Sequence, residues 1–176
     1  CAGYRYAGKN LDLTGKLNEI LTPLPPLQQL VVVPYANTSC TADDFQTEAK
    51  VECWEDFYQA EGEPSFTPVP FEQPLYILYS SGTTGVPKCI VHGAGGTLLQ
   101  HVKELGLHSD VGADDTLFYY TTCGWMMWNW LVSGLALGAT LVLYDGSPFH
   151  PEPTRLIDLI DAEEISVFGT SAKFIA

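Results

Sequence analysis

Residues 75–88 have the sequence LYILYSSGTTGVPK, an apolar run followed by a loop of hydroxyl and glycine residues that ends in a lysine. The apolar residues 75–79 predict a strand. Cys89-Ile90-Val91 follows the loop directly and predicts a second, short strand. A strand that leads into a glycine-rich loop, with regular helices and strands after it, indicates an α/β fold.

The loop has the composition of an anion-binding site. Its glycines let the backbone approach a ligand and point N–H groups at it, and its hydroxyl groups add hydrogen-bond donors. Lys88 supplies the only basic side chain between positions 50 and 103. Pro87 precedes this lysine and a strand follows it, so the loop is not a Walker A motif, in which Gly-Lys-Ser/Thr opens a helix. The alternative is a flexible hairpin with a solvated lysine. The candidate phosphate-binding residues are Ser80, Ser81, Gly82, Thr83, Thr84, Gly85 and Lys88.

Composition excludes several classes of partner. The chain of 176 residues is 46% hydrophobic and only 16% charged, below the usual ~25%, which argues against disorder. It carries 8 Lys and Arg against 21 Asp and Glu, a formal net charge of −13. Nucleic acids and anionic membrane surfaces are therefore not expected as general partners. An anion must be bound by a local group of residues such as the loop.

Strands and helices alternate after the loop. This alternation predicts an α/β fold around a mainly parallel sheet, with right-handed crossovers. The expected elements are a helix at 97–107, a strand at 117–121, a helix at 125–137, a strand at 140–144, a helix at 154–162, a strand at 165–168 and the start of a helix at 171–176.

Three regions are expected. Residues 1–36 form the end of an α/β unit, with a helix that ends before Pro23 and a strand at 30–33. Residues 37–74 form an acidic, proline-rich connector with a short helix near Trp54. Residues 75–176 form the subdomain that contains the loop. Length favours one domain or a large part of one.

Two features bear on location. The uncharged segment 116–144 is long enough to span a membrane, but its glycine and polar interruptions and acidic flanks favour a buried strand–helix–strand unit. The five cysteines are widely spaced, with no Cys-x-x-Cys pair, so we expect reduced thiols, a cytosolic protein and no structural metal. His101 and His108 lie seven positions apart, too far to chelate one metal ion.

The loop resembles that of a known family. Ser80–Lys88, with His92 four residues further on, is similar to the phosphate loop of the adenylate-forming enzymes, which include the acyl-CoA synthetases. Segments 89–97, 121–129 and 143–148 resemble the acetoacetyl-CoA synthetase subfamily. The likeness is strongest over 75–148 and weakest over 37–74.

The resemblance implies ATP, Mg²⁺ and CoA as cofactors and cosubstrates, and a small-molecule carboxylate as the acid. By this resemblance, the loop binds the β- and γ-phosphates of ATP and Lys88 supplies their counter-charge. Thr84 makes a contact near the metal ion. It places residues 125–127 beside the acyl group, although a buried helix core is the alternative and fits Trp128 and Trp130 better. The residues expected in the acid pocket are Trp125, Met126, Met127, Gly169 and Thr170.

The resemblance also implies that the chain is part of the N-terminal domain of a longer enzyme. The family's adenine-binding and magnesium-binding segments, its hinge aspartate and its C-terminal lysine have no counterpart here. We expect a parent that makes acetoacetyl-CoA and a segment that is inactive alone. The alternatives are an acetyl- or other short-chain acyl-CoA synthetase, and a non-catalytic module that binds nucleotide or a partner.

Overall fold

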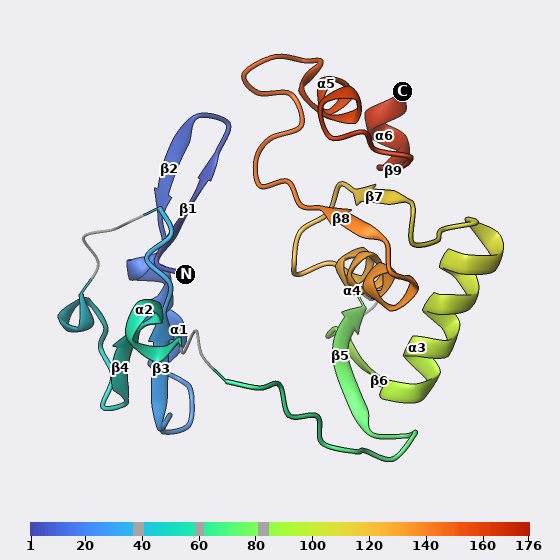
Figure 1. The fold of residues 1–176 in the computed structure, drawn as a ribbon. Helices are drawn as coiled ribbons and strands as arrows, with labels where there is room; N and C mark the ends of the chain where they lie inside the picture. Colours follow the sequence, from blue (N-terminus) through green and yellow to red (C-terminus); the bar gives the residue numbers. More distant parts are fainter. Residues whose placement is uncertain (37–40, 59–61, 81–84) are drawn as a thin grey trace. The chain divides into compact units, whose positions relative to one another are not determined.

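The computed structural model describes residues 1–36, 41–58, 62–80 and 85–176. The chain divides into two compact units (Figure 1). The first unit consists of Cys1–Ser65 and Gly146–Arg155. The second consists of Phe66–Asp145 and Leu156–Ala176.

The first unit begins with a hairpin that the sequence analysis did not anticipate. Strands β1 (Gly3–Tyr6) and β2 (Lys9–Asp12) pair antiparallel. Ala7 and Gly8 join them with φ angles of 47° and 77°, and two consecutive positive φ values are typical of a tight hairpin turn. Alanine rarely occupies such a position, so the sequence carries no standard turn signal here.

The rest of this unit is a helix packed beside a parallel strand pair. Helix α1 (Thr14–Leu21) ends before Pro23, as expected. Strand β3 (Gln29–Val32) pairs in parallel with β4 (Lys50–Cys53), and helix α2 (Trp54–Phe57) follows. The short 3-10 helix η1 (Ala42–Asp44) precedes β4. The segment expected to be a connector therefore contains a strand. The buried core consists of Ala2, Val32 and Phe45, with Leu17, Leu21, Leu30 and Val51 packed against it.

The second unit contains a hairpin and a three-stranded sheet. Strands β5 (Pro74–Ser80) and β6 (Lys88–Gly93) pair antiparallel, and helix α3 (Ala94–Val102) continues into the π-helical segment η2 (Lys103–His108). Strands β7 (Thr116–Tyr119), β8 (Thr140–Val142) and β9 (Val167–Gly169) form a parallel sheet in the order β8–β7–β9. The remaining elements are α4 (Met126–Val132), the 3-10 helix η3 (Ser133–Leu137), α5 (Arg155–Ala162) and α6 (Ala172–Ile175).

Both faces of β7 are buried. Successive side chains of a strand point to opposite faces, so Leu117 and Phe118 enter different hydrophobic clusters. Leu117 packs with Leu105 and Leu131, whereas Phe118 packs with Leu156. Burial on both faces explains why the sequence from 116 to 120 is almost wholly apolar.

The amino-terminal edge of this sheet is held by Asp115. Its carboxylate accepts a 2.8 Å hydrogen bond from the backbone N–H of Gly112 and a 2.7 Å bond from the hydroxyl of Ser166. These two donors hold the pKa of the Asp115 carboxyl below its ordinary value, because they favour the charged form. The backbone N–H of Thr116 donates to Ser166 Oγ at 3.0 Å. Asp115 and Ser166 thus join the starts of β7 and β9.

The structure confirms the α/β class. The sheets are small and partly parallel: the pairs β3–β4, β7–β8 and β7–β9 are parallel, and β1–β2 and β5–β6 are antiparallel. Segment 116–144 forms β7, α4, η3 and β8, the strand–helix–strand unit that was favoured. Within the described ranges, no helix has both the length and the apolar character needed to cross a membrane.

Candidate active site

The β5–β6 hairpin brings the two ends of the glycine-rich loop together. Ser80 lies directly opposite Lys88 in the register of the two strands. Gly85 has a φ of 115°, which side chains rarely allow, so a glycine suits this point of the loop. Residues 81–84, four of the candidate phosphate-binding residues, lie outside the described residues. The two described anchors, Ser80 and Lys88, are on adjacent strands.

The charge of Lys88 is available to a ligand. Its side chain is exposed at the start of β6. Among the residues that the structure describes, no carboxylate lies within ion-pair distance of its Nζ, whereas Lys50 pairs with Glu52 at 3.0 Å. In a chain with a net charge of −13, an unpaired lysine beside a glycine-rich loop gives a local positive potential for an anion.

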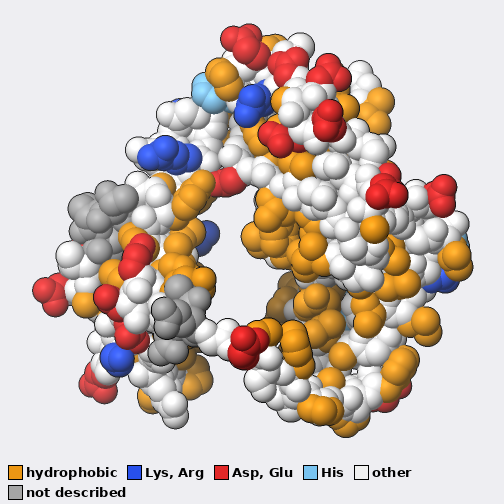
Figure 2. Space-filling model, in the orientation of Figure 1, with side chains coloured by type: hydrophobic (Ala, Val, Ile, Leu, Met, Phe, Trp, Pro, Cys, Tyr) orange, Lys and Arg blue, Asp and Glu red, His pale blue; other side chains and the backbone are white. Residues whose placement is uncertain are grey.

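The hairpin also presents an apolar surface. Leu75, Ile77, Tyr79, Ile90 and Val91 are each between 47% and 70% exposed. Figure 2 shows hydrophobic side chains gathered over this part of the second unit. Lys88 is therefore set at the end of an apolar strand pair.

The carboxyl ends of β7 and β9 form a second part of the candidate site. Tyr119 lies opposite Gly169 in the parallel register, and the backbone N–H of Tyr120 donates to Gly169 O at 2.9 Å. A Cβ on Gly169 would lie 2.2 Å from Tyr119 Cδ2, so only glycine fits here. Ligands of α/β proteins bind beyond the carboxyl ends of the strands, and the register brings the predicted residues Gly169 and Thr170 beside the start of the β7–α4 segment.

Helix α4 begins with exposed side chains and continues with side chains that pack in the core. Trp125 and Met126 are 65% and 44% exposed, and Met127 is half-buried. Trp128 and Trp130 instead pack against the hydrophobic cluster around Leu117. The ring of Trp130 also makes an edge-on contact with Tyr119, with centroids 5.9 Å apart. Trp125, Met126 and Met127 are thus not part of this hydrophobic cluster.

Thr170 has an unsatisfied hydroxyl. Its Oγ1 is buried and has no hydrogen-bond partner among the described residues. A buried hydroxyl without a partner costs about 1–3 kcal/mol, so native structures rarely keep one. An additional polar group, from a ligand or from further chain, fits this position.

His101 is a residue of this region that sequence reasoning treated only as half of an unlikely metal pair. It is 7% exposed, and its Nδ1 lies 2.8 Å from Ser133 Oγ. Burial lowers the pKa of His101, Glu104 raises it and His92 lowers it further. The partner lies 32 residues away. No local pattern in the sequence could have shown this contact.

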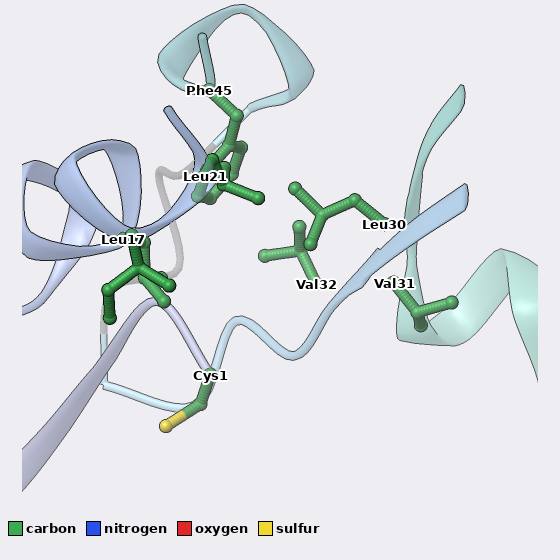
Figure 3. Close-up of a pocket in the computed structure, with 8 residues that line it drawn as sticks. Cys1, Leu17, Leu21, Leu30, Val31, Val32 and Phe45 are labelled. Carbon is green, nitrogen blue, oxygen red and sulfur yellow. The ribbon is translucent and has the colours of Figure 1, made fainter. Parts of the chain in front are cut away.

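Two other kinds of site are less suitable. A pocket of about 90 Å³ in the first unit is lined by aliphatic side chains, Phe45 and Cys1, and Figure 3 shows Leu17, Leu21 and Phe45 close to Leu30 and Val32 across it. None of the side chains that line it is charged. Within the described ranges, no group of three His, Cys, Asp or Glu side chains is placed to bind a metal ion.

Comparison with known proteins identifies the family. The family profile described as "AMP-binding enzyme" matches residues 13–175. The chain belongs to this family. It is 53% identical to the acetoacetyl-coenzyme A synthetase of Rhizobium meliloti (strain 1021) over 176 residues, which cover 99% of this chain and 27% of that protein.

Two further relatives of the chain have the same name. The acetoacetyl-CoA synthetase of Gallus gallus is 47% identical over 97% of this chain and 26% of that protein. The solved structure of the acetoacetyl-CoA synthetase from Streptomyces lividans superposes with a TM-score of 0.89, at 44% identity, over 99% of this chain and 26% of that one. The chain therefore spans about a quarter of the length of the relatives it matches.

Proposed function

We propose that this chain is part of an acid–CoA ligase that converts acetoacetate, ATP and CoA into acetoacetyl-CoA, AMP and pyrophosphate. The observation that carries the proposal is the 53% identity, over 99% of this chain, to a protein named acetoacetyl-coenzyme A synthetase. The TM-score of 0.89 to a second protein of that name supports a common fold. The segment alone lacks three quarters of its relatives' length, and we expect it to be inactive.

The reaction proceeds in two steps. A carboxylate oxygen of the acid attacks the α-phosphorus of ATP, a new P–O bond forms, and the bond to the β-phosphate breaks with loss of pyrophosphate. The CoA thiolate then attacks the carbonyl carbon of the acyl-adenylate, and AMP leaves with the electrons of the broken C–O bond. Catalysis of such transfers depends mainly on positioning and on neutralising charge.

The loop at the end of the β5–β6 hairpin is the proposed phosphate site. Lys88 Nζ would neutralise charge on the β- and γ-phosphates as pyrophosphate departs, and its freedom from any described carboxylate supports this role. Ser80, residues 81–84 and Gly85 would supply hydroxyl and N–H donors. Mg²⁺, when bound with ATP, neutralises phosphate charge, and Thr84 is proposed to lie near it.

The acid pocket is proposed at the carboxyl ends of β7 and β9. Trp125 directly precedes α4, and Met126 and Met127 begin it. Trp125 and Met126 are exposed and Met127 is half-buried, so these side chains are accessible to an acyl chain. Gly169 and Thr170 would form the opposite side. The unsatisfied Thr170 hydroxyl supports this placement, because the carbonyl or carboxylate of the acid can accept its hydrogen bond.

Acid-dependent exchange of labelled pyrophosphate into ATP by the full-length protein tests the proposal. We expect exchange to be fastest with acetoacetate in a panel that also contains acetate, propionate and butyrate, and the CoA ester to form on addition of CoA. Faster exchange with acetate would indicate another short-chain ligase. ATP binding without exchange for any acid would indicate a non-catalytic nucleotide-binding module. The cytosolic location stays a prediction, which fractionation of cells can test.

A further inference from the structure

Helix α3 and the end of helix α4 are joined by a hydrogen bond between a buried histidine and a half-buried serine. His101 Nδ1 of α3 and Ser133 Oγ of η3 are 2.8 Å apart. His101 is 7% exposed, and Ser133 is half-buried. Leu105 follows His101 by four positions and Leu131 precedes Ser133 by two, and these two leucines belong to one buried hydrophobic cluster. A polar contact in such surroundings is directional, whereas the apolar packing around it is not.

The second bond of Ser133 determines which atom donates. Ser133 Oγ also donates to the backbone carbonyl of Asn129, at 2.9 Å. A hydroxyl group has a single proton, so Ser133 must accept the bond from His101. His101 therefore carries its proton on Nδ1 in the neutral ring, and Nε2 holds the lone pair. Burial keeps the pKa of His101 low, which favours this neutral form.

The contact fixes one end of the helix whose other end carries the proposed acid pocket. Ser133 directly follows α4, and Asn129 lies within it. Helix α4 has seven residues and thus a length of about 10 Å, so a tilt at residues 129–133 displaces Met126 and Met127. The bond to His101 is a directional contact between α3 and this end of α4.

We propose that His101 is a positioning residue for the acid pocket, acting through Ser133 on the orientation of α4. The proposal rests on the proposed function, since it assigns Met126 and Met127 to the acid. It gives His101 no contact with substrate and no proton transfer. It predicts that loss of the His101–Ser133 bond weakens binding of the acid and leaves binding of ATP unchanged.

The test compares two replacements of His101, one that places a polar group near Nδ1 and one that places it near Nε2. In the full-length enzyme, His101→Asn places an amide N–H where Nδ1 lies, whereas His101→Gln reaches toward the position of Nε2. We expect His101→Gln and Ser133→Ala to raise the KM for acetoacetate by about tenfold, because small displacements of positioning groups have large effects on reacting geometry. His101→Asn should stay within about twofold of the wild type, as the donor is retained.

A double variant and a matched control complete the experiment. His101→Gln combined with Ser133→Ala should raise the KM for acetoacetate no more than either change alone, because both remove the same bond. The KM for ATP should stay unchanged in every variant. The control is His108→Gln, which alters an exposed histidine of η2 and should leave both KM values unchanged.

Three outcomes would overturn the positioning role. They are equal rises in the KM values for acid and ATP, a loss of thermal stability without any change in the KM for acetoacetate, and failure of His101→Asn to restore acid binding. The proposed function fails separately, if the wild-type enzyme shows no acid-dependent exchange at all. A wild type that exchanges pyrophosphate with acetoacetate while His101→Gln keeps its KM would exclude the positioning role alone.

Discussion

Asp115 and Ser166 are 51 positions apart in the chain, and the Ser166 hydroxyl donates a 2.7 Å hydrogen bond to the Asp115 carboxylate. Because Asp115 precedes β7 and Ser166 precedes β9, this bond joins the amino-terminal ends of two adjacent parallel strands. The opposite, carboxyl ends of the same strands carry the proposed acid pocket. The bond thus holds the two strands together at the ends that lie opposite the proposed pocket.

Loss of this bond should loosen the sheet locally. Asp115→Asn removes the charged acceptor, and we expect faster amide hydrogen exchange in β7 and β9 of the full-length protein, measured by mass spectrometry. Asp114→Asn is the control, because this neighbouring carboxylate is exposed and should leave exchange unchanged. Equal exchange in Asp115→Asn and the wild type would show that the bond adds nothing to the sheet.

The same carboxylate predicts a pH dependence with a defined sign. Its pKa is lowered in the folded protein, so its contribution to stability is complete above the ordinary value of about 3.9 and is lost as the pH falls through the lower folded value. The difference in protection between wild type and Asp115→Asn should therefore persist at neutral pH and shrink in acid. A difference that grows on acidification, with exchange corrected for its intrinsic rate, would contradict this assignment.

Replacement of Lys88 should impair adenylation. Lys88→Ala removes the positive charge next to the proposed phosphate loop, and we expect acid-dependent pyrophosphate exchange to fall at least about tenfold, or ~1.4 kcal/mol of transition-state stabilisation. Lys16→Ala is the matched control, since this lysine is exposed in α1 of the first unit. An unchanged rate in Lys88→Ala would remove Lys88 from the site.

Shortening a pocket side chain should change acid preference. Met126→Ala enlarges the proposed pocket, and we expect kcat/KM for 3-oxohexanoate relative to acetoacetate to rise by about threefold to tenfold, since each buried methylene contributes about 0.8 kcal/mol. Leu135→Ala is the control, because it shortens another exposed apolar side chain, in η3, and should leave the ratio unchanged. The same ratio in both variants would place the acid elsewhere.

Gly169 should not tolerate a methyl group. In Gly169→Ala the new Cβ meets the ring of Tyr119, which is itself held against Trp130, so we expect a loss of about 1–3 kcal/mol and a lower melting temperature. Gly15→Ala in α1 meets open space and should not destabilise the protein. A melting temperature for Gly169→Ala equal to that of the wild type would show that the Tyr119 ring can move aside.

Local patterns predicted most elements of the second unit. Apolar runs and helical spacing identified β5, β7, β8, α4 and α5. For β7 and α5 the reason is burial, which the sequence records directly. Strand β5 is apolar although Leu75, Ile77 and Tyr79 are exposed. The helix predicted at 97–107 is split between α3 and the π-helical η2, a distinction of backbone bonding that spacing does not carry. Strand β4 was missed because its four residues, Lys50–Cys53, lie in a highly acidic segment.

The candidate site was predicted in composition but not in arrangement. The residues that resemble a known loop were identified from their type and order, and the structure shows that Ser80 and Lys88 face each other across the hairpin. The His101–Ser133 and Asp115–Ser166 bonds join residues 32 and 51 positions apart. Such contacts depend on the packing of helices and strands, which no periodicity within one segment specifies.

Strand β7 lies at the centre of its sheet, and this position limits which substitutions it tolerates. Its edges are taken by β8 and β9, and its Leu117 and Phe118 are enclosed on opposite faces, so nearly any change within the strand is felt in the core. After β7, in contrast, Trp125 and Met126 are exposed and belong to neither cluster. If the acid binds at the strand ends as proposed, a change of acid requires substitutions at only a few such residues, while β7 and the clusters around it stay the same.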